Sequence, residues 1–207
     1  MDVRVVGEDG DRIWLYKPAG VPCFPPHGNP DGDSVLAQLL ALGLDRGGAW
    51  PDGFAGGIAH RLDTATDGLL LVARHPAALH RLREEWGQLR KFYRFRSDGV
   101  VTDGSAAVTP ITVELAHHPN RKDRMVARRG PRTTHRGRWY PAWTAISDLG
   151  NGWWEAEIRT GVMHQVRVHA AFVGLPLVGD AIYGGAAGEF RLTHVRVVGP
   201  GWLSPAL

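Results

Sequence analysis

Short strand-like segments constrain the fold of this chain more than any other feature of its sequence. Residues 12–17 alternate in a strand-like way, and this pattern ends at Pro18. Residues 69–73 form a short apolar run suited to a buried strand. Similar patterns predict further strands at 91–95, 111–116, 139–147, 153–159 and 190–198. Most of these segments are joined by short turns, which favours antiparallel pairing.

Helical patterns are fewer than strand patterns. They predict helices over 34–42, from His75-Pro76 onward, and over about 162–173, where Gly174 ends the last one. Apolar spacing predicts inward faces for the second and third helices, formed by Leu79, Leu82, Trp86 and Leu89 and by Met163, Val166, Ala170 and Val173. We therefore expect an α+β fold, with a mixed, mostly antiparallel sheet and a few packed helices, in a single domain over residues 1–207.

Composition excludes several classes of protein. No apolar run approaches the roughly 20 residues needed to cross a bilayer, and the polar, acidic N-terminus does not resemble a signal peptide. Cys23 is the single cysteine, so no disulfide can form within the chain and no cysteine-based zinc site can be built from it. We expect a cytoplasmic monomer that does not engage membranes.

The charge is modest overall but unevenly placed. The formal net charge is +3, and the basic residues are mostly arginine, whose planar fork suits phosphates and base edges. The segment 117–138 holds one acid, Asp123, against a run of basic residues, namely Arg121, Lys122, Arg124, Arg128, Arg129, Arg132, Arg136 and Arg138. This pattern is typical of a polyanion contact, although a solvated loop that keeps the protein in solution would look the same.

A polar cluster in residues 60–67 precedes the predicted strand 69–73. A turn in this position holds side chains rigidly beside a cleft, so Asp63 is a candidate catalytic carboxylate. The alternative is a turn in which Asp63, Thr64, Thr66 and Asp67 only cap backbone amides. The residues of the turn do not decide between these interpretations.

The start of the predicted helix 162–173 is the second candidate site. His164 and Arg167 lie three residues apart on one helical face, and Gln165 and His169 lie four apart on another. A helix N-terminus with an arginine favours an anionic partner, either a phosphate or a carboxylate such as Asp63. The alternative is an amphipathic helix with a polar outer side.

Two other chemistries fit the sequence less well. The five-residue spacing of His164 and His169 is not that of a helical zinc site, and no suitably spaced acid accompanies them. Cys23 with His27 lacks a third residue that would orient a nucleophile, and a lone cysteine is more often a small buried apolar residue. We therefore expect no metal.

Four motifs in this chain, taken together and in order, resemble those of the RluA-type family of RNA pseudouridine synthases. They are Lys17-Pro18-Ala19-Gly20-Val21-Pro22; His60-Arg61-Leu62-Asp63 with Thr66-Asp67-Gly68-Leu69-Leu70-Leu71; Lys91-Phe92-Tyr93; and Thr160-Gly161 with His164-Gln165-Val166-Arg167-Val168-His169, Gly174-Leu175-Pro176-Leu177-Val178-Gly179-Asp180 and Tyr183-Gly184. The resemblance spans about residues 12 to 198. It implies the pseudouridine synthase catalytic-domain fold and no cofactor.

The resemblance also implies an activity and a set of site residues. The activity is isomerisation of uridine to pseudouridine in ribosomal or transfer RNA, with Asp63 as catalytic carboxylate, Arg167 as its ion-pair partner and Tyr93 beside the uracil. No RNA-binding domain of the S4 type precedes the first motif, so we expect this domain itself to grip RNA. The expected RNA contacts are Lys17, Arg61, Arg121, Arg124, Arg128, Arg129, His164 and Gln165.

The chain departs from the family pattern at two places. Asp67 stands where the family usually has serine, and Val162-Met163 stand where it usually has Arg-Thr. These departures leave open an RNA-binding module of the same fold without catalysis. A glycoside hydrolase using Asp63 and Asp67 as paired carboxylates is a third alternative, but it ignores the arginine bias and the other motifs.

Overall fold

The computed structural model describes residues 2–44, 49–101 and 110–207, and they form two compact units. Unit 1 comprises Met1–Leu89 and Thr193–Leu207, and unit 2 comprises Arg90–Leu192. The sheets combine antiparallel pairs with one parallel pair, which confirms the predicted mixed, mostly antiparallel architecture. No helix in the described part of the chain is long and apolar enough to cross a membrane.

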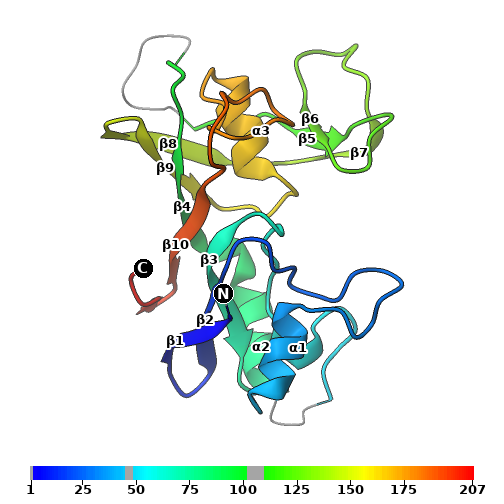
Figure 1. Ribbon diagram of the computed structural model, residues 1–207, viewed down its shortest axis with the longest axis vertical. Coiled ribbons are helices and arrows are strands. Elements are labelled where there is room, and N and C mark those ends of the chain that lie inside the picture. The colour runs from blue at the N-terminus through cyan, green and yellow to red at the C-terminus, as the bar shows by residue number, and fades with distance from the viewer. Residues whose placement is uncertain (1, 45–48, 102–109) are drawn as a thin grey trace. The chain divides into compact units, whose positions relative to one another are not determined.

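Unit 1 is built on a sheet in the order β1-β2-β3-β10, with β11 paired to β10 (Figure 1). The strands are β1 (Arg4–Glu8), β2 (Arg12–Lys17), β3 (Asp67–Ala73), β10 (Leu192–Gly199) and β11 (Trp202–Leu203). Strand β3 pairs antiparallel with β2 and parallel with β10. The predicted strands 12–17, 69–73 and 190–198 are therefore confirmed, whereas β1 and β11 were not predicted.

Helices α1 (Val35–Ala41) and α2 (Pro76–Glu85) belong to unit 1, together with the 3-10 turns η1 (Ala55–Gly57) and η2 (Trp86–Gln88). Helix α2 begins where predicted, because the His75 ring accepts the backbone N–H of Ala78 and Pro76 occupies the first turn. Leu79 and Leu82 pack with Trp14 and Leu71 in one buried cluster. This apolar face fixes α2 on the sheet that carries the end of the 60–67 turn.

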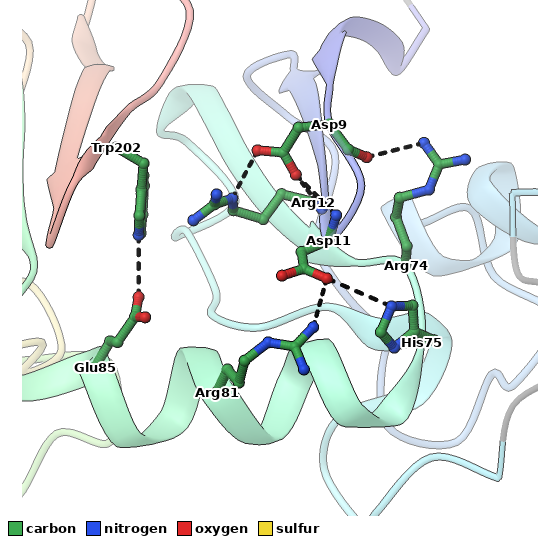
Figure 2. A network of polar contacts seen from close by, with 8 residues as sticks. All are labelled: Asp9, Asp11, Arg12, Arg74, His75, Arg81, Glu85 and Trp202. Atoms are coloured by element: carbon green, nitrogen blue, oxygen red, sulfur yellow. Dashed lines mark hydrogen bonds and ion pairs between the residues drawn. The ribbon is translucent and has the colours of Figure 1, made fainter.

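Exposed polar contacts tie the β1–β2 turn to the start and the middle of α2, and a separate contact ties β11 to the end of α2 (Figure 2). Asp11 pairs with Arg81 and lies 3.5 Å from the His75 ring, and the Arg74 guanidinium donates to the Asp9 carbonyl over 3.3 Å. At the other end of α2, the indole N–H of Trp202 donates to Glu85 over 3.0 Å. Exposed ion pairs each contribute little, so the apolar face of α2 supplies most of its attachment.

Unit 2 contains two sheets and helix α3 (Gln165–Phe172) (Figure 1). One sheet has the order β4-β9-β8, from Arg90–Arg96, Trp153–Ile158 and Thr144–Gly150. The other has the order β6-β5-β7, from Met125–Ala127, Leu115–His117 and Arg136–Tyr140. The predicted strands 91–95 and 153–159 are confirmed, and β6 was not predicted.

Two predicted strands in unit 2 have the wrong extent. The segment 139–147 is two strands in different sheets, because Pro141 has no N–H to donate and the N–H of Trp143 bonds to the Thr160 hydroxyl. In segment 111–116 only Ile111 pairs with β8 before β5 begins at Leu115. The carbonyl of Val113 faces the His169 ring instead, at 2.9 Å.

Helix α3 starts three residues later than predicted. His164 has a left-handed φ of 55°, and the side-chain oxygen of Gln165 accepts the N–H of Val162, so residues 162–164 form a turn. Val166 and Ala170 are buried as predicted, and Gly174 follows the helix with a φ of 90°. The alternative interpretation, an amphipathic helix with a polar outer side, does not hold, because Gln165, Arg167 and His169 are buried.

Candidate active site

The turn that carries Asp63 is fixed from its inner side. The Cys23 thiol accepts the N–H of Leu62 over 3.2 Å and donates to the carbonyl of the same residue over 3.4 Å. The turn closes through the N–H of Thr66, which donates to the carbonyl of Asp63. Asp63 itself is half-buried. Its backbone is therefore held on both sides, as a catalytic carboxylate requires.

Lys17 contributes to the same turn from inside the protein. Its side chain is fully buried, and the ammonium donates to the carbonyls of Pro18, Val21 and Thr64 at 2.9, 2.7 and 3.2 Å. Burial lowers the pKa of Lys17, and the nearby carboxylates of Asp67 and Asp63 oppose that shift. Because the Lys17 ammonium is buried and bound to three carbonyls, it cannot make the predicted contact with RNA.

Asp67 acts as an anchor between strands. Its Oδ2 accepts from the Tyr16 hydroxyl over 3.0 Å, and its Oδ1 accepts from the Thr193 hydroxyl over 2.8 Å. Burial and the Asp67 carboxylate together raise the pKa of Tyr16, which stays a neutral donor. Both oxygens of Asp67 are thus engaged in holding β2, β3 and β10, which does not favour the use of Asp67 as a second hydrolytic carboxylate.

His60 and Arg61 have different surroundings and therefore different roles. The Nε2 atom of His60 accepts the N–H of Leu71 over 3.1 Å, and its ring packs against Trp86 and edge-on against His194. Arg61, by contrast, is exposed. His60 therefore fixes the turn to β3, and Arg61 is the member of the motif that is accessible to a large substrate.

Gly68 explains why β3 and β10 can meet directly after the turn. Its φ is 114°, and a Cβ atom at this position would lie 2.3 Å from the backbone oxygen of His194. Only glycine fits both conditions. The close approach places Thr193 opposite Asp67 in the parallel pair.

In unit 2, Arg167 lies in α3 and is held by a buried carboxylate that no sequence signal singles out. Its Nε and Nη2 atoms donate to the two oxygens of Asp180, both at 2.7 Å. The guanidinium also stacks on the Tyr183 ring, 5.0 Å from the centroid. A bidentate pair fixes both the position and the plane of Arg167.

Tyr183 joins several parts of this region. Its hydroxyl accepts the N–H of Met125 over 2.9 Å and lies 2.9 Å from the Nδ1 atom of His164. Burial raises the pKa of Tyr183 to about 12, so the phenol remains neutral. Asp180 and Tyr183 appear in the sequence as parts of one motif, but no spacing signal identifies them as partners of Arg167.

A second buried network explains Gln165 and His169. The Gln165 amide donates to the carbonyl of Trp143 and to the Thr144 hydroxyl, over 2.8 and 3.0 Å. The His169 ring contacts the Thr144 hydroxyl and the Val113 carbonyl, and burial lowers its pKa. Both side chains therefore fix α3 to β8. Gln165, which we predicted to contact RNA, is 3% exposed.

Tyr93 and Lys91 lie in β4 and are buried. Tyr93 pairs with Ala156 in the antiparallel register with β9 and is 8% exposed. Burial lowers the pKa of Lys91 to about 8. Tyr93 and Arg167 belong to unit 2 and Asp63 to unit 1, so their predicted meeting stays a prediction.

The arginine-rich segment 117–138 is folded rather than a loose loop, since it contains β6 and the start of β7. Thr133 closes the connection between them, because its hydroxyl accepts the N–H groups of Arg129 and Gly130 and donates to the Gly130 carbonyl. Arg128 pairs with Glu114, and Arg121 pairs with Asp123 over 3.0 Å. Arg121, Arg128 and Arg129 are exposed.

No group of three or more His, Cys, Asp or Glu side chains that could hold a metal ion occurs among residues 2–44, 49–101 and 110–207.

The fold is that of solved pseudouridine synthase structures. Human RNA pseudouridylate synthase domain containing 1 matches with a TM-score of 0.70 and 21% identity, over 95% of this chain and 78% of that one. Human RNA pseudouridylate synthase domain containing 4 matches with a TM-score of 0.68 and 18% identity, over 93% and 82% of the two chains. At these identities the likeness shows the fold.

The family follows from the sequence comparison. The model described as RNA pseudouridylate synthase matches residues 11–172, so the chain belongs to the RNA pseudouridine synthase family, which confirms the predicted RluA-type relationship. An uncharacterised RNA pseudouridine synthase of Synechocystis is 36% identical over 86% of this chain and 54% of that protein. The Escherichia coli (strain K12) ribosomal large subunit pseudouridine synthase D is 34% identical over 87% and 52%. The chain spans about half the length of these relatives.

Proposed function

We propose that this protein isomerises uridine to pseudouridine in RNA, and that both units together form one catalytic domain. The family match over residues 11–172 carries the proposal, because this range includes Asp63, Tyr93 and Arg167 and crosses from unit 1 into unit 2. Large-subunit ribosomal RNA is the first substrate to test, since several relatives are named as large-subunit synthases. Transfer RNA is the second.

The reaction breaks the bond between uracil N1 and ribose C1′, turns the base, joins C5 to C1′ and releases the C5 proton. Asp63 either attacks C1′ or stabilises the cationic sugar and takes a sugar proton. Support for its role comes from the turn, whose backbone Cys23 and Lys17 hold from inside the protein. Arg167 would keep Asp63 ionised, and Tyr93 would stack near the uracil and help remove the C5 proton.

RNA would be gripped by exposed cations. A uridine within folded RNA has to leave its stack, which costs a few kcal/mol and is offset by phosphate contacts and stacking in the protein. Arg61 and the arginine-rich segment 117–138 supply accessible charge for this purpose. Replacing exposed arginines of this segment should weaken RNA binding and flatten its salt dependence without changing the chemical step.

The test is release of tritium from ribosomal RNA labelled at uracil C5. We expect release by the wild type, none by Asp63→Asn, and measurable release by the matched control Asp67→Asn, which removes a neighbouring carboxylate charge. Tight RNA binding without release by the wild type from ribosomal or transfer RNA would favour the non-catalytic RNA-binding module instead. Equal loss in both variants would contradict the particular role of Asp63.

A further inference from the structure

A cavity of about 390 Å³ lies in unit 2 between α3 and the arginine-rich segment. One side is formed by Val168, Ala171 and Phe172, which share a face of α3 because they are three and four residues apart. The opposite side is formed by β6. Its size lies within the range of small-molecule sites.

Two arginine–aromatic stacks border the cavity. The guanidinium of Arg129 lies 5.0 Å from the centroid of the Phe172 ring, and that of Arg124 lies 5.6 Å from the centroid of the Tyr183 ring. All four residues line the cavity. Aromatic faces and arginine planes are the surfaces on which unpaired nucleobases stack, and the same arginines attract phosphate.

The cavity is held in shape before any ligand binds. Thr133, which lines it, closes the turn after β6 through its hydrogen bonds with Arg129 and Gly130. Tyr183 is fixed by Met125 and His164. A site with fixed walls binds without having to order them first.

No acid occurs among the described residues that line the cavity. Its lining therefore contains no carboxylate that could act on C1′ of a sugar. A nucleotide bound there would be held but not isomerised. This separates the cavity from the chemistry assigned to Asp63.

We propose that this cavity binds one unpaired nucleotide of the RNA substrate, other than the uridine that reacts, with its base against the Arg129–Phe172 and Arg124–Tyr183 stacks and its phosphate at the edges of the same two arginines. The proposal rests on the proposed function for the identity of the ligand as RNA. Because Tyr183 also stacks on Arg167, a nucleotide in this cavity would contact the residue that supports the arginine of the proposed active site. The cavity would thus recognise an unstacked nucleotide near the target.

The test fills the cavity. Ala171→Phe places a ring in it from the last turn of α3, and Ala77→Phe is the matched control, since Ala77 is an exposed alanine in α2. The probes are a single-stranded heptamer of uridines, a matched RNA duplex and inorganic phosphate, with binding measured at fixed salt. We expect Ala171→Phe to weaken heptamer binding by about 5-fold to 150-fold, the loss that removal of one stacked base gives. Ala77→Phe should bind all three probes as the wild type does.

Direct placement comes from crosslinking of the wild type. A heptamer with 5-iodouridine should crosslink to Tyr183 or Phe172 in the wild type, as mapped by mass spectrometry. Ala171→Phe should abolish these crosslinks and still show a cooperative thermal unfolding transition, which shows that the variant is folded. Unchanged heptamer affinity in folded Ala171→Phe, or equal weakening for heptamer and duplex, would overturn the proposal. If Ala171→Phe does not fold, absence of crosslinks at both rings in the wild type would overturn it. These readouts report binding, so absence of tritium release would contradict the proposed function and leave this inference intact.

Discussion

Removal of Asp180 should destabilise the protein strongly, because it breaks the buried ion pair with Arg167. The side chains of Arg167 and Asp180 are 7% and 1% exposed, and both of their hydrogen bonds measure 2.7 Å. Removing one partner of a buried pair costs about 3–5 kcal/mol, because the remaining charge is left desolvated. Asp180 also accepts the N–H of Ile182, so Asp180→Ala loses a further contact.

The assay is urea unfolding followed by tryptophan fluorescence. With a urea dependence of about 2 kcal/mol per M, a loss of 3–5 kcal/mol lowers the midpoint by about 1.5–2.5 M. Asp180→Asn should lose less, since the amide keeps the shape and one acceptor. The double variant Arg167→Met with Asp180→Leu should recover most of the stability, because apolar residues can replace a buried pair at little cost.

Two results would refute this reasoning. A loss below about 1 kcal/mol for Asp180→Ala would mean that the pair is solvated enough to behave like a surface pair. Additive losses in Arg167→Met, Asp180→Leu and the double variant would mean that the two side chains do not depend on each other. Asp180→Asn also tests positioning, since it should reduce the rate of tritium release more than it reduces RNA affinity.

Three further predictions concern stability. Cys23→Val should lower the free energy of unfolding in urea by about 1–3 kcal/mol, because the Leu62 N–H loses its acceptor. Cys23→Ser should lower it less, and equal losses in the two variants would contradict the role of the thiol. Burial lowers the pKa of His169 below its usual 6.5, so as the pH falls the unfolded chain takes up a proton before the folded protein does, and the free energy of unfolding should decline below about pH 6.5. His169→Gln should make this decline smaller, as measured by urea unfolding at pH 5.5 and 7.5. The same decline in the variant and the wild type would contradict the prediction. Asp11→Ala should cost less than about 1 kcal/mol despite losing Arg81 and His75, because the network in Figure 2 is exposed; a larger fall in thermal stability would show that α2 depends on it.

The sequence predicts those elements whose signals are local. Strand β3 follows from an apolar run, and the start of α2 follows from His75-Pro76, because a cap and a fixed proline φ act within one turn. The prediction fails where distant partners decide. No residue near Val113 in the sequence indicates that the Val113 carbonyl contacts the His169 ring. That contact keeps the segment before β5 out of the sheet.

The candidate site shows the same division between local and distant information. The turn around Asp63 could be located from its polar residues before an apolar strand. Its supports could not, because Lys17 lies 47 residues from the Thr64 carbonyl and Cys23 lies 39 residues from the Leu62 N–H. Arg167 could be singled out as a cation at a helix start. Its partner Asp180 could not, because an aspartate after a glycine reads as an ordinary turn residue until the chain has folded.

The departures from the family pattern have structural explanations, and this bears on whether the protein is a catalyst. Asp67 replaces a serine, but both of its oxygens accept hydrogen bonds, from Tyr16 in β2 and Thr193 in β10. Val162 and Met163 pack against the apolar cluster beneath α3, where the usual arginine and threonine would have to find polar partners. Each departure is therefore matched by a local change in packing or hydrogen bonding, and neither removes Asp63, Tyr93 or Arg167. Asp67, Val162 and Met163 therefore no longer favour a non-catalytic RNA-binding module. The comparison of tritium release by Asp63→Asn and Asp67→Asn is the direct test of that alternative.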